Sequence, residues 1–116
     1  MTVQQTGIVD WMGLERNTGH VILTIVDDLD WSDEQAHLLA LQEKLNTYLS
    51  FAESGEVFQR LTQQVGRVVA PDTPIKMSVL TKYPLPLRAR EFFQHATRVF
   101  REAGFELTSK VLSAPS

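Results

Sequence analysis

The segment DDLDWSDE, residues 27–34, holds the densest group of side chains that could do chemistry. Five of its eight residues are carboxylates. Carboxylate oxygens are the ligands that hard cations such as Ca²⁺ and Mg²⁺ prefer, and a pair of carboxylates can work as general acid and base. The same residue types are also typical of a turn that leads into the first turn of a helix.

The spacing of these residues favours a helix start. An EF-hand loop needs oxygen ligands at alternate positions, a central glycine and a terminal Glu. Asp28, Asp30 and Glu34 roughly fit, but no glycine lies between them. Ser32 is the predicted N-cap, because a glutamine follows three residues later as in a capping box. Asp33 and Glu34 then lie in the first turn, where the helix dipole favours carboxylates.

No other group of side chains matches a catalytic or metal-binding motif. His20, His37 and His95 lie in different predicted elements and lack the HExxH spacing. His37 follows Asp33 by four residues, which permits a weak ion pair on a helix surface. The chain has no cysteine, and it has neither a Gly-rich phosphate loop nor a Gly-x-Ser-x-Gly turn. We therefore expect no catalytic residues, no metal and no cofactor.

The apolar pattern predicts one α+β domain with the order ββαβαβ. Strands are expected at 8–14, 21–26, 75–83 and 105–112, and helices at about 33–53 and 86–103. Each helix has a single apolar stripe and the strands mostly alternate, so we expect a two-layer sandwich of about four strands with two helices on one face. Segment 56–72 is compatible with helix, strand or loop, and the pattern leaves the strand order open.

The 116 residues are the length of one domain. We expect an ordered core at 7–112, with loose ends at 1–6 and 113–116. A net charge of −3 argues against nucleic acid or an anionic membrane as partner. No run of about 20 apolar residues could cross a bilayer, and the N-terminus does not have the pattern of a signal peptide. These features predict a cytoplasmic protein with no membrane contact.

Several apolar residues lie outside the positions that are predicted to face the core. Leu39 and Phe51 lie off the main stripe of the first helix, and Leu80 and Leu112 fall among polar positions of their strands. In the strand at 8–14, neither face is plainly polar. These positions predict that the uncovered sheet face, or an edge, is buried against another chain, and a homodimer is the expected assembly.

Four residues are candidates for binding. Lys82 and Tyr83 follow a predicted strand, at a position where loops often carry function. With Trp31 at the start of the first helix they could line a small pocket, although the two aromatic rings could equally fill the end of the core. Trp11, in the opening hairpin, is the fourth candidate.

The segments LTIVDDLDW, LQEKLNTYLSFAESGE and KYP carry a resemblance to a known family. Over residues 9–112 the chain resembles a family of small bacterial proteins of unknown function. The resemblance implies a bacterial cytosolic protein and transfers no catalytic residue, and such proteins sometimes look like immunity or accessory proteins.

The leading hypothesis is a non-enzymatic interaction module that self-associates and binds a protein partner. The alternative is a small-molecule- or cation-binding enzyme. Its site would lie near Asp28, Asp30, Trp31, Lys82 and Tyr83.

Overall fold

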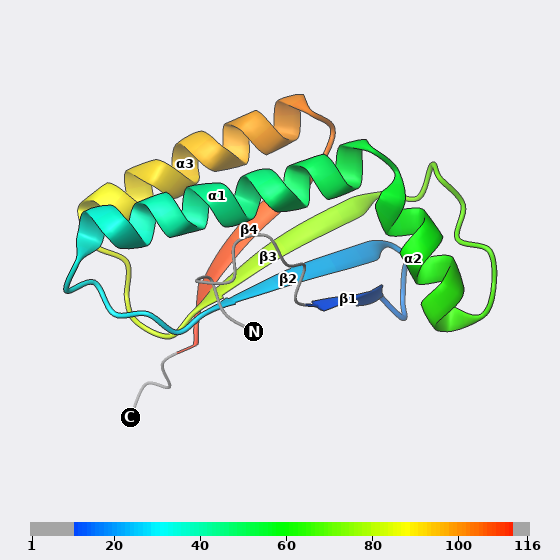
Figure 1. The fold of residues 1–116 in the computed structure, drawn as a ribbon, viewed down its shortest axis with the longest axis horizontal. Helices are drawn as coiled ribbons and strands as arrows, with labels where there is room; N and C mark the ends of the chain where they lie inside the picture. Colours follow the sequence, from blue (N-terminus) through cyan, green and yellow to red (C-terminus); the bar gives the residue numbers. More distant parts are fainter. Residues whose placement is uncertain (1–10, 113–116) are drawn as a thin grey trace.

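A four-stranded sheet forms one layer of the molecule (Figure 1). The structure is a computed structural model that describes residues 11–112. The strands are β1 (Trp11–Leu14), β2 (Val21–Asp27), β3 (Ile75–Thr81) and β4 (Glu106–Val111), and they lie side by side in the order β1-β2-β3-β4. β1 pairs antiparallel with β2, whereas β2–β3 and β3–β4 are parallel. Residues 8–10 of the first predicted strand and both predicted loose ends lie outside the described residues.

The helices are α1 (Glu34–Glu53), α2 (Glu56–Val65) and α3 (Leu87–Glu102). α1 and α3 lie side by side over one face of the sheet, and each belongs to a crossover between two parallel strands (Figure 1). α2 lies at the far end of α1, beside the hairpin, where the Gln64 side chain donates to the carbonyl of Met12 at 3.2 Å.

The predicted α+β class with four strands is confirmed, but the element order is ββααβαβ. The additional helix is α2, which takes up the first part of the segment that the sequence left open. Gly55 separates it from α1 by adopting φ +80°, a backbone conformation that other residues rarely reach. Val57 and Leu61 of α2 are fully buried, so packing decides a segment whose local pattern was ambiguous.

Alternation along the two central strands places the core on one side of the sheet. Val21, Leu23 and Ile25 of β2 are buried, and their register partners in β3 are Ile75, Met77 and Val79. The intervening positions of both strands are only half-buried. Successive side chains of a strand point to opposite faces of the sheet. The buried set therefore lies on one face, which is the face that α1 and α3 cover.

The apolar stripes of α1 and α3 complete this core. Leu41, Leu45 and Tyr48 of α1 are buried, and the Tyr48 hydroxyl donates to the carbonyl of Thr24 at 2.9 Å. Phe51, which the sequence suggested as surplus, is also buried at 6% exposure, so that prediction is wrong. Its ring joins the hydrophobic core beyond the main stripe. Of the other surplus positions, Leu39 and Leu112 are exposed and Leu80 is half-buried.

The N-cap of α1 is Asp33, so the prediction of Ser32 is wrong. The Asp33 carboxylate accepts a hydrogen bond from the Ala36 N–H at 3.1 Å. Ser32 instead turns back towards Asp30, whose Oδ1 accepts from the Ser32 hydroxyl at 2.6 Å and from its N–H at 3.1 Å. Because the Asp30 carboxylate binds the Ser32 hydroxyl, Asp33 is the residue that caps the helix.

We expect Asp33→Ala to lower the free energy of unfolding by about 0.5–2 kcal/mol, because an N–H of the first helical turn loses its acceptor. Asp33→Asn is the matched control and should change stability little, since the amide oxygen can still accept. Ser32→Ala should cost less than Asp33→Ala. Urea unfolding of the three variants measures this order, and a larger loss in Ser32→Ala than in Asp33→Ala would contradict the assignment.

Candidate functional site

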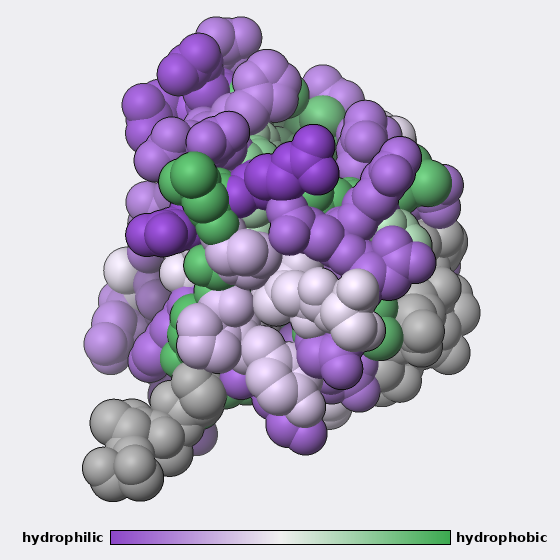
Figure 2. All heavy atoms as spheres, turned by 90° about the vertical axis from the view of Figure 1, so that its left-hand side faces the viewer, coloured by the Kyte–Doolittle hydropathy of each residue, from purple (hydrophilic) through white to green (hydrophobic). Residues whose placement is uncertain are grey.

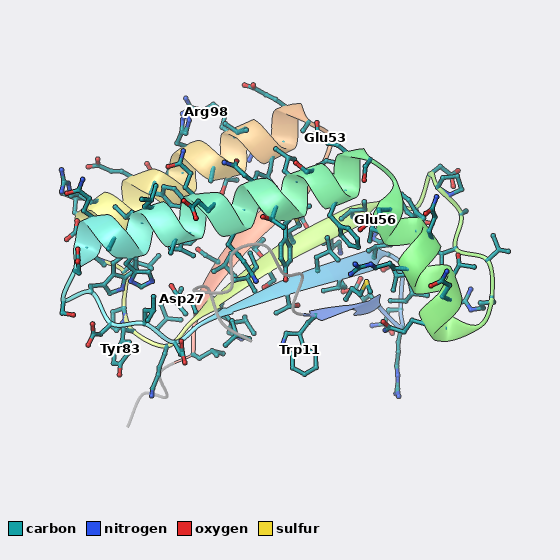
Figure 3. All side chains as sticks on the ribbon, viewed as in Figure 1. Trp11, Asp27, Glu53, Glu56, Tyr83 and Arg98 are labelled. Carbon is teal, nitrogen blue, oxygen red and sulfur yellow. The ribbon has the colours of Figure 1, made fainter. Side chains whose placement is uncertain are left out.

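A buried Asp–His pair lies where β2 ends and α1 begins. Asp27 is the last residue of β2 and is 1% exposed, and His37 in the first turns of α1 is 3% exposed. His37 Nε2 lies 2.6 Å from Asp27 Oδ2, and His37 Nδ1 lies 2.9 Å from the Asp30 carbonyl oxygen. Figure 3 shows Asp27 at the end of the sheet, below the first half of α1. The two bonds fix the 28–33 connection against α1.

The partners of the imidazole determine where its protons lie. A backbone carbonyl can only accept, so His37 Nδ1 carries a hydrogen. The contact between Nε2 and Asp27 Oδ2 then needs one further proton, held either by the imidazole or by the carboxyl group. Burial raises the pKa of Asp27, and the hydrogen bond from His37 opposes that shift. Burial is thus the larger influence on the pKa of the Asp27 carboxyl group.

Trp31 covers this pair. Its ring stacks on His37 with a centroid distance of 3.7 Å and an angle of 21° between the planes. The Trp31 indole N–H is buried and makes no hydrogen bond with the residues that the structure describes. Asp27 Oδ1 also accepts from the Leu29 N–H at 3.2 Å, so the carboxylate is bonded on both oxygens. The ring and the connection together shield the pair from solvent.

This arrangement is unsuited to general base catalysis. In a catalytic triad one ring nitrogen of the histidine is held by a carboxylate, and the other is left to accept the proton of the nucleophile. Here both nitrogens of His37 are occupied, by Asp27 and by the Asp30 carbonyl. Accepting a substrate proton would require breaking one of these bonds. The geometry therefore suits a structural clamp.

The other acidic residues of the connection are engaged locally or exposed. The two hydrogen bonds from Ser32 lower the pKa of Asp30, and Asp28 is exposed. Within residues 11–112, no three His, Asp or Glu side chains gather in an arrangement that could hold a metal ion.

The structure brings three of the four predicted binding residues to one end of the sheet. The Lys82 N–H donates to the Asp27 carbonyl at 2.9 Å, which places the segment after β3 beside the start of the 28–33 connection that carries Trp31. Lys82 Nζ lies 5.6 Å from the centre of the Tyr83 ring, and both residues are exposed. Figure 2 faces this end, where hydrophilic and weakly polar residues predominate.

Trp11 lies apart from these three residues. It pairs with Thr24 in the sheet register, and Figure 3 shows its side chain pointing away from the helices. Thr24 alternates with the core residues of β2, so Trp11 lies on the sheet face opposite α1 and α3, and it is 55% exposed.

Sequence reasoning missed the role of His37. The weak ion pair with Asp33 that the spacing permits does not form, because Asp33 caps the helix and His37 points inward to Asp27. The signal was present, since position 37 lies four residues before Leu41 and continues the apolar stripe of α1. Lys44 was missed in the same way: it is fully buried, with Nζ 5.8 Å from the centre of the Tyr48 ring.

A mixed four-stranded sheet, helices on one face and a buried Asp–His clamp define a small α+β domain. The chain belongs to DUF6572, a family of unknown function whose model matches residues 1–113, and the resemblance to such a family is thus confirmed. No curated protein and no solved structure was found to match. No helix within residues 11–112 is long and apolar enough to cross a membrane.

We expect His37→Ala to destabilise the fold by about 3–5 kcal/mol, because removing one partner leaves the buried Asp27 carboxylate without its main hydrogen bond. His95→Ala is the control, since His95 is exposed on α3 and should change stability little. Denaturant midpoints measure both variants. Similar midpoints for the two would show that the clamp contributes nothing.

The raised pKa of Asp27 predicts how stability depends on pH. Because the folded state holds this proton more tightly than the unfolded chain, the contribution is fully present below about pH 3.9 and is lost as pH rises through the folded pKa. The free energy of unfolding of the wild type minus that of Asp27→Asn should therefore fall as pH rises from about 4. Urea unfolding of both proteins across this range measures the difference, and a difference that rises with pH would contradict the sign.

Proposed function

We propose that the protein is a non-catalytic bacterial cytosolic interaction module that self-associates and binds a protein partner, as an immunity or accessory protein does. The observation that carries the proposal is the sheet face that no described helix covers. The occupied nitrogens of His37 add support, because the best-formed polar pair of the described residues has no free group to offer a substrate.

The uncovered face carries apolar side chains where a solvated sheet would carry polar ones. Trp11 is 55% exposed there, and Ile22, Val26 and Leu80 are half-buried on the same face. An antiparallel or mixed sheet with one solvated face normally alternates apolar and polar residues. A half-apolar face with an exposed aromatic ring is instead typical of a surface that another protein covers.

Trp11 is the residue of this face best suited to anchor a partner. Tryptophan offers a large apolar area with few rotatable bonds, and it is enriched among residues that dominate binding energies. Gly13, its neighbour on the same side of β1, has no side chain and leaves space next to the ring. Thr24 and Ser78, which are register partners on the two central strands of this face, provide hydroxyl groups for hydrogen bonds with the partner.

Two substitutions at equally exposed positions test this face. Trp11 and Leu39 are each 55% exposed, but Leu39 lies on α1, on the opposite side of the molecule. We expect Trp11→Ser to lose partner binding and Leu39→Ser to retain it, with similar melting temperatures. The proteins encoded by flanking genes, co-expressed and co-purified one at a time with this chain, are the candidate partners.

If Trp11→Ser and Leu39→Ser bind the partner equally well, the uncovered face is not the binding surface. The self-association half is tested separately by light scattering over a concentration series. A strict monomer at the highest concentration would contradict that half.

A further inference from the structure

β4 has an outer edge with no partner strand among the described residues. Within residues 11–112 it pairs with β3 alone, and it lies at the opposite side of the sheet from β1 (Figure 1). Its six residues contain no proline, and all except Leu107 are exposed. Proteins usually shorten, bend or cover such an edge, because its free N–H and C=O groups can pair with another strand.

The hydrogen bonds to β3 show which backbone groups of β4 face outward. The Leu112 N–H donates to the Thr81 carbonyl at 2.6 Å, and the Lys110 carbonyl accepts from the Thr81 hydroxyl at 3.4 Å. Positions 110 and 112 therefore face β3. Because backbone groups alternate along a strand, the N–H and C=O groups of Leu107, Ser109 and Val111 point away from the sheet.

The charges of β4 are self-complementary in one antiparallel register. With a two-fold axis at Thr108, Leu107 of one copy lies opposite Ser109 of the other, and their outward groups form a hydrogen-bonded pair. Glu106 then lies opposite Lys110 of the second copy, and Lys110 lies opposite its Glu106. These are non-hydrogen-bonded positions, where facing side chains approach most closely.

Neighbouring registers lack this match. An axis at Leu107 places Glu106 opposite Thr108, and an axis at Ser109 places Lys110 opposite Thr108. An axis at Lys110 or at Glu106 brings like charges together, which is unfavourable. The other edge of the sheet, β1, has four described residues and none of them is charged.

We propose that two copies of this chain associate through β4, antiparallel about a two-fold axis at Thr108, so that the two sheets form one continuous sheet. This inference rests on the self-association in the proposed function and specifies its surface. It leaves the uncovered face, with Trp11, free for a different protein.

A single cysteine tests the register directly, because the chain has none of its own. Thr108→Cys places two thiols at the axis, where facing Cα atoms of a non-hydrogen-bonded pair are about 4.5 Å apart. We expect a disulfide-linked dimer under mild oxidation. Lys110→Cys is the control: its two copies would be about 14 Å apart along the strands, beyond the roughly 7 Å that a disulfide spans. Equal cross-linking of both variants would overturn the register.

Charge exchange provides a second test that does not depend on oxidation. Glu106→Lys or Lys110→Glu alone replaces both attractive pairs with repulsive ones, and should weaken the dimer on the order of tenfold. The double variant Glu106→Lys/Lys110→Glu restores opposite charges across the axis and should restore the affinity. Failure of the double variant to recover, with its fold intact by circular dichroism, would contradict the pairing.

Ser109→Pro removes an outward N–H that β3 does not use, and should abolish the dimer, whereas Ser109→Ala should retain it. Light scattering of these variants separates the two proposals. A wild-type monomer at all concentrations would overturn self-association and the β4 interface together. If the wild type is a dimer, and Ser109→Pro and the charge variants at 106 and 110 dimerise with the same affinity, only the β4 interface would be overturned.

Discussion

The hydrogen bond between Asp27 and His37 is the constraint on which the arrangement of the layers depends. It joins the end of a central strand to the second turn of the helix that follows, across ten residues of sequence. A buried carboxylate without a partner is strongly unfavourable, so the helix has few positions in which both groups are satisfied. The Tyr48 hydroxyl makes a second bond to the carbonyl of Thr24 in the same strand. These two hydrogen bonds fix the position of α1 along the sheet. Apolar packing alone would define that position less specifically.

Much of the architecture could be predicted because it follows from local periodicity. The alternation along β2 and β3, and the glycines and prolines that end the elements, are visible in the sequence and place four strands and two of the three helices close to where they occur. α2 could not be assigned because Val57 and Leu61 fit either a helix or an extended segment until their burial is known. Ser32 and Asp33 are both good caps, and only the competing carboxylate of Asp30 decides between them.

The polar core was harder to predict for a different reason. Hydrophobic patterns treat His37 and Lys44 as interruptions of a stripe, yet both are buried in positions that continue it. A buried titratable side chain is recognisable from sequence only when its partner is local, and Asp27 becomes a partner only after α1 folds back over β2. The candidate binding residues show the same limit. Trp31, Lys82 and Tyr83 lie at the same end of the sheet because they follow β2 and β3, which are parallel. Trp11 lies on a face of the sheet, away from that end.

The strands lie in the sheet in the same order as in the chain, so each strand has its sequence neighbour as a partner. The hairpin of β1 and β2 is made of residues close in the sequence, and β3 and β4 each pair with the strand that precedes them in the chain. The His37 partner of Asp27 is available before β3 has been made. A chain that lacks β4 would present the edge of β3 in place of the edge of β4.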